Sequence, residues 1–258
     1  MMVEYEVQGR VGLITLNRPE ARNAVNGFVA ADMEAAVDQL EADPEVWIGI
    51  LRANTAGQDR PVFSAGADLK AINSDGPPLG TSRGGFGGFT FRERRKPVIA
   101  AVDGLATAGG CELVLACDLV VATTRSSFGL AEVKRNLVAG AGGLFRLPRA
   151  IGRAAAMEAI LTGEPIPAVR AYTLGLVSRL VEPGQAVEEA LKLAAKICEN
   201  APVAVWESRK VVLAADHGDD NTLMEMTNAA MRVVMGSEDL KEGLAAFVEK
   251  RSPNWTGR

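Results

Sequence analysis

Histidine and cysteine are scarce in this chain, and their scarcity excludes several kinds of active site. The 258 residues contain one histidine, His217, and three cysteines that form no Cys-x-x-Cys pair. This composition argues against a structural zinc site and against a Ser–His triad, which need clustered cysteines or a paired histidine. Any chemistry must therefore come from carboxylates and from the backbone, and no metal ligands are predicted.

Long apolar runs and dense basic stretches are missing as well. No apolar run approaches the ~20 residues that span a bilayer, and Glu4 and Glu6 interrupt the N-terminal region where a signal peptide would lie. With an odd number of cysteines, the sequence predicts a reduced cytoplasmic protein without a membrane partner. The net charge is −4, and the most basic stretch, Arg92–Lys96, contains Glu93. Such a stretch is typical of a solvated turn, so no nucleic-acid partner is predicted.

The residues that are present predict an α/β core. Hydrophobic residues make up 48% of the chain, which is enough to bury the core of one large domain or of a core with an appendage. A helical apolar pattern runs from Val29 to Leu40, with Asn26 as its expected N-cap and Asp43-Pro44 as its end. Short apolar runs typical of buried strands lie on either side of it and beyond, at Val11–Leu16, Trp47–Leu51, Val98–Val102, Leu119–Ala122 and Leu176–Val181. Strands alternating with helices indicate the α/β class.

The composition changes near Pro183, and the rest of the chain reads as successive helices. These are expected over residues 184–199, 202–215, 219–235 and 237–250. We therefore divide the chain into a core over residues 1–195 and a helical region over residues 196–258. The apolar residues Met224, Met231, Val234 and Met235 favour a subunit interface in this region. Packing of the helices on their own core stays open as the alternative.

The segment Asn73–Gly88 is rich in Gly, Pro and Ser. A structureless loop of that length is usually functional or disordered, so two interpretations stay open: a mobile flap beside a site, or surface disorder. Its Gly84–Gly88 stretch neither follows a predicted strand nor opens a helix, which argues against a dinucleotide fingerprint.

Two segments lead from a strand into a helix through small residues. They are Phe63–Lys70, where a short helix is expected near Asp68, and Asp103–Leu113, where the helix continues through Ala116. The first N–H groups of a helix have no intrahelical acceptor, and small side chains let a ligand approach them. The first segment, taken alone, favours a tight strand-to-helix turn without a ligand.

Two glutamates lie in or after these segments. Glu112 falls in the first turn of the second helix, where a carboxylate also stabilises the helix dipole. Glu132 lies among apolar neighbours in Ser127–Val133, where an unpaired carboxylate would have a raised pKa. An ion pair with Lys134 or Arg135 is the alternative. Neither glutamate alone indicates catalysis.

Taken together, the segments resemble the crotonase family, also called the enoyl-CoA hydratase/isomerase family. The resemblance covers essentially the whole chain, and its motifs are specific in combination and less so apart. They are Asn17–Ala24, Ser64–Lys70, Ala108–Asp118, Phe128–Val133 and Ala246–Arg251. The resemblance implies an α/β fold built as a spiral of repeated ββα units. It also implies a C-terminal helical region that forms homotrimers, commonly paired into hexamers.

The resemblance further implies an acyl-CoA substrate and a set of catalytic groups. The N–H groups of Ala67 and Gly109 would form an oxyanion hole for the thioester, each donor stabilising the transition state by ~3–4 kcal/mol. Glu112 would deprotonate a water that attacks Cβ, and Glu132 would deliver a proton to Cα. The implied activity is the reversible syn addition of water to an enoyl-CoA in fatty-acid or related acyl-CoA degradation.

Substrate-binding residues are implied in the same way. The backbone from Ala65 through Ala67, Asp68 and Leu69 to Lys70 would contact coenzyme A, together with Gly109, and Gly140 would help to hold the water. Arg22–Ala24 would line the adenine pocket, with Lys70 and Lys250 near its phosphates. Solvated lysines are the alternative. Coenzyme A is part of the substrate, so no cofactor is predicted.

Three residues depart from the family pattern: Ala108, Ala139 and Asn136 stand where glycine, proline and glycine are frequent. Each could reshape the acyl pocket, which argues against a short straight-chain substrate. Two other functions stay open: an isomerase or other acyl-CoA lyase of the same family, and a non-catalytic acyl-CoA-binding or interaction protein. The presence of both Glu112 and Glu132 favours hydration.

Overall fold

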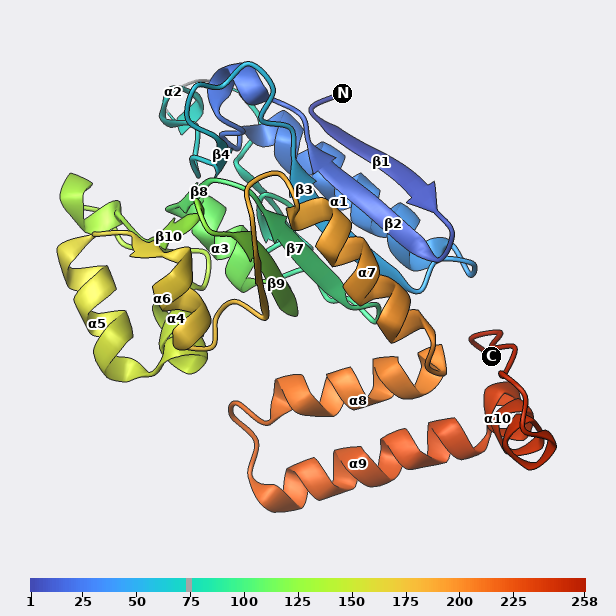
Figure 1. Ribbon diagram of the computed structural model, residues 1–258. Helices are drawn as coiled ribbons and strands as arrows, with labels where there is room; N and C mark the ends of the chain where they lie inside the picture. The colour runs from blue at the N-terminus through green and yellow to red at the C-terminus, as the bar shows by residue number, and fades with distance from the viewer. Residues whose placement is uncertain (73–75) are drawn as a thin grey trace.

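Two β-sheets flanked by helices form the centre of the molecule (Figure 1). The computed structural model describes residues 1–72 and 76–258. The larger sheet has the strand order β1-β2-β3-β7-β9-β12 and the smaller one β11-β10-β8-β4, with β1 and β11 antiparallel to their neighbours. The bounds in the larger sheet are Val3–Gln8, Val11–Leu16, Ile48–Ala53, Val98–Val102, Leu119–Thr123 and Arg179–Val181. Those in the smaller sheet are Ile166–Pro167, Ser127–Gly129, Leu105–Thr107 and Val62–Ser64.

The chain passes from one sheet to the other in a repeated order. Strand β3 of the larger sheet is followed by β4 of the smaller one and then by helix α2 (Leu69–Ile72). Strands β7 and β8 precede α3 (Gly109–Leu115) in the same way, and β9 and β10 precede a 3₁₀ turn at Glu132–Arg135. The predicted α/β spiral of ββα units is confirmed. Its geometry brings the ends of β4, β8 and β10 to one side of the smaller sheet.

The inner strands of the larger sheet, such as β2, β3 and β7, are buried on both faces, which explains why they read as continuous apolar runs. Along β3, Ile48 and Ile50 belong to the cluster that packs against α7 (Ala186–Cys198). Leu51 belongs to the opposite cluster, which includes the buried residues of α1 (Gly27–Ala42). The predicted N-cap of α1 is confirmed, because the Asn26 side chain accepts a hydrogen bond from the Val29 N–H at 2.9 Å.

The C-terminal helices match their predicted ranges closely. They are α7, α8 (Pro202–Ala214), α9 (Asp220–Met235) and α10 (Glu238–Glu249). Figure 1 shows α7 lying on the larger sheet, while α8 and α9 run side by side away from it. Residue 195 falls inside α7, and the division of the chain at that point stays a prediction.

Some elements differ from the sequence prediction. The strand predicted over Leu176–Val181 is shorter, because the N–H groups of Leu176 and Val177 donate to Ala171 O and close helix α6 (Ala168–Thr173). Strand β1 and the short strands of the smaller sheet were not predicted. Two further helices, α4 (Gly143–Ile151) and α5 (Arg153–Thr162), precede β11.

The Gly-rich segment is a defined hairpin in its described part, residues 76–88, whereas residues 73–75 of the predicted flap lie outside the described residues. Strands β5 (Gly80–Thr81) and β6 (Gly85–Phe86) pair antiparallel. The Arg83 guanidinium donates to Asp38 on α1 at 2.6 Å. A Cβ at Gly88 would lie 2.1 Å from the Ala30 carbonyl oxygen, so glycine is required for this close approach. The expectation of a structureless loop is therefore wrong for residues 76–88.

Helices of the described residues are all too short or too polar to cross a membrane.

Candidate active site

The first predicted oxyanion segment follows β4 and is held by the segment that contains Asn23. The Ser64 hydroxyl donates to Asn23 O at 2.8 Å and accepts from the Gly66 N–H at 3.2 Å. Asn23 is itself buried, and its amide donates to the carbonyls of Asn54 and Val62. The predicted Arg22–Ala24 segment therefore lies directly beside the oxyanion segment.

The second segment packs against the end of the first. A Cβ at Gly110 would lie 2.2 Å from Ser64 O, and a Cβ at Gly66 would lie 2.7 Å from Gly109 N. Ala108, which precedes Gly109, has φ 51° and ψ −130°, a backbone conformation that residues other than glycine rarely adopt. The start of α3 therefore touches the turn after β4 backbone to backbone.

Two backbone donors on these touching segments have no partner within the described chain. The N–H groups of Ala67 and Gly109 donate no hydrogen bond there, whereas the neighbouring Asp68 N–H donates to Val25 O at 2.8 Å. Free, fixed N–H groups on adjacent segments are what an oxyanion hole requires. The structure thus brings Ala67 and Gly109 into one place, and their catalytic role stays a prediction.

Glu112 is a buried carboxylate held by a distant loop. Its Oε1 accepts hydrogen bonds from the N–H groups of Ala141 at 2.7 Å and Gly143 at 2.9 Å. Gly142 between them has φ +105°, which turns the two N–H groups toward the same oxygen in an anion-binding nest. Burial raises the pKa of Glu112 even though both hydrogen bonds oppose the rise. Neither sequence-based interpretation of Glu112 included this nest.

Glu132 carries an oxygen without a partner. Its Oε2 is buried and has no hydrogen bond within the described chain. The ion pair considered with Lys134 is absent from the described residues, because the Lys134 amine pairs with Glu164 at 2.6 Å. Burial raises the pKa of Glu132, and the nearby charge of Glu112 adds to the rise. Two carboxyls of raised pKa in mutual electrostatic contact are typical of an acid–base pair.

This burial predicts a measurable effect on stability. The pKa of a glutamate in an unfolded chain is ~4.3. Since folding raises the pKa of Glu132, the carboxyl supports the fold fully below that value, and this support is lost as the pH rises through the folded pKa. We expect Glu132→Gln to raise the midpoint of thermal unfolding at neutral pH by ~2 °C.

Circular dichroism melts at neutral and acid pH test this, and the difference from the natural protein should shrink toward acid pH. The exposed Glu182 provides the control, because Glu182→Gln should leave the midpoint unchanged. A lower midpoint for Glu132→Gln at both pH values would contradict the expectation.

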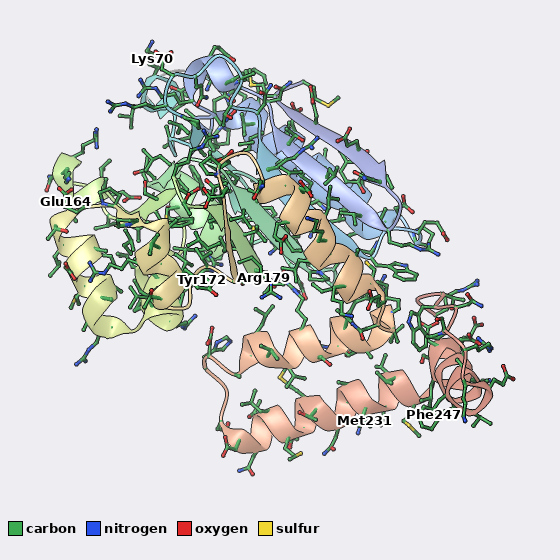
Figure 2. All side chains as sticks on the ribbon, in the orientation of Figure 1. Lys70, Glu164, Tyr172, Arg179, Met231 and Phe247 are labelled. Carbon is green, nitrogen blue, oxygen red and sulfur yellow. The ribbon has the colours of Figure 1, made fainter. Side chains whose placement is uncertain are left out.

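Other predicted binding residues lie at the edge of this region. The Asp68 carboxylate already has partners within the protein. It accepts a hydrogen bond from the Arg18 guanidinium at 2.7 Å, which lowers the pKa of Asp68, and another from the Lys70 N–H at 3.1 Å. Leu69 and Lys70 are exposed, and Lys70 points outward in Figure 2. Lys250 ends α10 on the opposite side of the molecule from α2, so one chain does not bring the two lysines together (Figure 1).

The remaining predicted residues lie beside the two segments. Ala65 N donates to Arg22 O at 3.0 Å, and Gly140 is exposed next to the nest that holds Glu112. Sequence reasoning missed Phe86, whose ring would lie 2.5 Å from a Cβ at Gly109. It stands in the Gly-rich stretch, whose composition suggested a loop rather than packing.

Comparison with known proteins decides the family. A profile described as "Enoyl-CoA hydratase/isomerase" matches residues 6–258. The chain belongs to this family. The resemblance seen in the motifs is thus confirmed, and the protein is a crotonase-family enzyme whose fold matches crotonase structures.

Relatives of this crotonase-family chain carry related names. The "Probable enoyl-CoA hydratase" of Rhizobium meliloti (strain 1021) is 40% identical over 257 residues, which cover 98% of this chain and 97% of that protein. The crystal structure of an enoyl-CoA hydratase from Mycobacterium tuberculosis H37Rv is 45% identical, with TM-score 0.91, and covers 100% of this chain and 99% of that one. A carnitinyl-CoA hydratase from Mycobacterium avium is 44% identical, with TM-score 0.77 and the same coverage.

Proposed function

We propose that this enzyme is an enoyl-CoA hydratase that adds water reversibly, in syn geometry, across the 2,3 double bond of an enoyl-CoA thioester. The observation that carries the proposal is the pairing of Glu112 and Glu132, both with raised pKa values, beside two backbone N–H groups that have no acceptor among the described residues. Addition of water needs a base and an acid at once, and such a pair provides both. The names of the relatives support the same reaction class.

The geometry suggests how the groups divide the work. The thioester oxygen would lie between the N–H groups of Ala67 and Gly109, which stabilise the negative charge that develops there. Because Oε1 of Glu112 already accepts two N–H groups, Oε2 is the oxygen that takes a proton from water. The water oxygen then bonds to Cβ, the π electrons move toward the thioester, and the Glu132 carboxyl gives its proton to Cα. In the reverse direction the two glutamates exchange these roles.

Hydration is tested by the loss of the conjugated-thioester absorbance of 2-trans-enoyl-CoAs of graded length and branching. We expect turnover with at least one of them. The departures at Ala108, Asn136 and Ala139, together with the carnitinyl-CoA relative, support a substrate other than a short straight chain. Isomerisation of 3-enoyl-CoA without any hydration would overturn the proposal in favour of an isomerase. Acyl-CoA binding without turnover would favour a binding protein.

The pH dependence of hydration should follow the glutamate pair. The reaction needs Glu112 ionised, so kcat/KM falls on the acid side as Glu112 gains a proton. Because burial raises the pKa of Glu112 above the ordinary glutamate value of ~4.3, this acid limb should lie at higher pH than for an exposed glutamate. The alkaline limb follows the loss of the Glu132 proton, and both apparent values belong to the coupled pair. An acid limb at or below the ordinary glutamate pKa would contradict these roles.

We also propose a homotrimer or hexamer built through the C-terminal helices. Met231 on α9 and Phe247 on α10 are 58% and 84% exposed and project from these helices in Figure 2. Met224, Met235 and Val248 are exposed as well, whereas Val234, expected to be exposed, is half-buried and its neighbour Val233 is exposed. An apolar surface of this kind is typical of a subunit interface.

Light scattering tests the assembly. We expect a mass several times the 27.2 kDa of one chain, reduced to one chain by a double change of Met231 and Met235 to Glu, because two buried charges would be unpaired. Val7→Glu on β1, another exposed apolar position, is the control and should keep the assembly. A single-chain mass for the natural protein would contradict the proposed assembly.

The three cysteines are free, which supports the cytoplasmic location proposed from the sequence.

A further inference from the structure

Arg146 on α4 bridges two segments that border the candidate active site. Its Nη1 donates to Ala141 O at 3.0 Å, and its Nη2 donates to Thr90 O at 2.6 Å. The guanidinium carbon lies 5.0 Å from the ring centre of Phe91 and 5.3 Å from that of Phe145. A planar guanidinium can stack on rings and bind two carbonyls at once, which an ammonium group cannot do.

At the Ala141 end, Arg146 holds the nest that binds Glu112. The N–H groups of Ala141 and Gly143 donate to the carboxylate, and the Ala141 carbonyl between them accepts from Arg146. The three groups belong to consecutive peptide planes, so anchoring the carbonyl holds the central plane that joins the two donor residues and restricts how far either donor can turn. A Cβ at Gly142 would lie 2.3 Å from Nη1, so glycine leaves the room that the guanidinium needs.

At the Thr90 end, Arg146 holds the turn that carries Phe86. The Thr90 N–H and hydroxyl each donate to Phe86 O at 3.2 Å, which closes that turn. The Phe86 ring in turn lies against Gly109, because a Cβ there would be 2.5 Å from two ring atoms. The Arg146 side chain thus connects the site of the Glu112 carboxylate to the turn of Phe86, whose ring lies beside Gly109.

We propose that Arg146 is a positioning residue that keeps Glu112 and Gly109 in register by bridging the carbonyls of Ala141 and Thr90. The proposal rests on the proposed hydratase function, in which both groups act on one substrate. Arg146 also contributes charge, since it lowers the pKa of Glu112 against the larger effect of burial. Bridging and charge can be separated, because lysine keeps the charge and loses the two-pronged bridge.

The test compares Arg146→Lys, Arg146→Gln and the control Arg149→Gln. The substrate in each assay is a 2-trans-enoyl-CoA that the natural enzyme hydrates. Arg149 is exposed on the same helix and stacks on Phe145 at 5.1 Å, outside the bridge. A displacement of ~1 Å at a reacting group can cost 10²-fold in rate. We therefore expect kcat to fall ~10²-fold in both Arg146 variants, with KM changed less than about threefold. Arg149→Gln should behave as the natural enzyme.

The pH profile provides a second readout that a general loss of stability would not move. In Arg146→Gln the acid limb of kcat/KM should shift to higher pH, and in Arg146→Lys it should stay in place. Full activity in Arg146→Lys would overturn the bridging role, and a rise in KM with unchanged kcat would assign Arg146 to substrate binding instead. The natural enzyme is assayed first: if it hydrates no enoyl-CoA the proposed function fails, whereas an active enzyme with unaffected Arg146 variants refutes only this inference.

Discussion

Replacing Glu112 by glutamine is expected to lower kcat for hydration by ~10²–10⁴-fold while acyl-CoA binding is retained. The amide oxygen of glutamine can still accept from the N–H groups of Ala141 and Gly143, so the nest and the start of α3 should keep their positions. The amide cannot take a proton from water, and that step alone should be lost. Glu132→Gln should show a loss of similar size, because it removes the proton donor.

Steady-state hydration and calorimetric titration with butyryl-CoA, which has no double bond to hydrate, separate the two effects. Glu182→Gln, at an exposed position, is the matched control and should keep full activity. A loss confined to KM, or activity close to that of the natural protein, would show that Glu112 does not act as the base.

Adding one methyl group at Gly110 is expected to reduce activity by ~10²-fold and the free energy of unfolding by ~1–3 kcal/mol. The new Cβ would lie 2.2 Å from Ser64 O, and a backbone atom cannot rotate away as a flexible side chain can. Either α3 or the end of β4 must therefore move. Gly109 begins α3 and Ala67 lies in the turn that follows β4, so the distance between the two donor N–H groups would change.

Gly236→Ala is the matched control for Gly110→Ala, because the nearest atoms to its Cβ would be 3.6 Å away, an ordinary contact. Urea unfolding and hydration assays should both leave Gly236→Ala close to the natural protein. A Gly110→Ala variant with full activity would mean that the contact between the two segments does not set the donor geometry.

The sequence predicted the long, buried elements of the fold and missed the short ones. Strands β2 and β7 lie between two layers of helices, so apolar side chains on both faces made their bounds readable. In strand β1, apolar residues alternate with the exposed Glu4 and Glu6. The segment therefore contains no continuous apolar run of the kind that marked the inner strands. Strands such as β4, of 3 residues, are too short to show any periodicity.

For the candidate site, the sequence identified the groups but not what holds them. The partners of Glu112 lie 29 and 31 residues away along the chain, beyond any local pattern. For Glu132 the local pattern suggested an ion pair with Lys134 or Arg135. The fold directs Lys134 to Glu164 and leaves Oε2 of Glu132 buried without a partner in the described chain. Contacts made by tertiary structure decide both environments.

Helix α9 is only partly covered by the rest of its own chain. None of its 16 residues is buried within a single chain, and an isolated helix of that length is marginal in water. In the homotrimer or hexamer proposed above, the order of this helix would depend on mass action and rise with the concentration of the chain that covers it. Dilution would then separate the subunits and loosen α9, which in one chain packs along α8 alone over most of its length, before it affected the sheets.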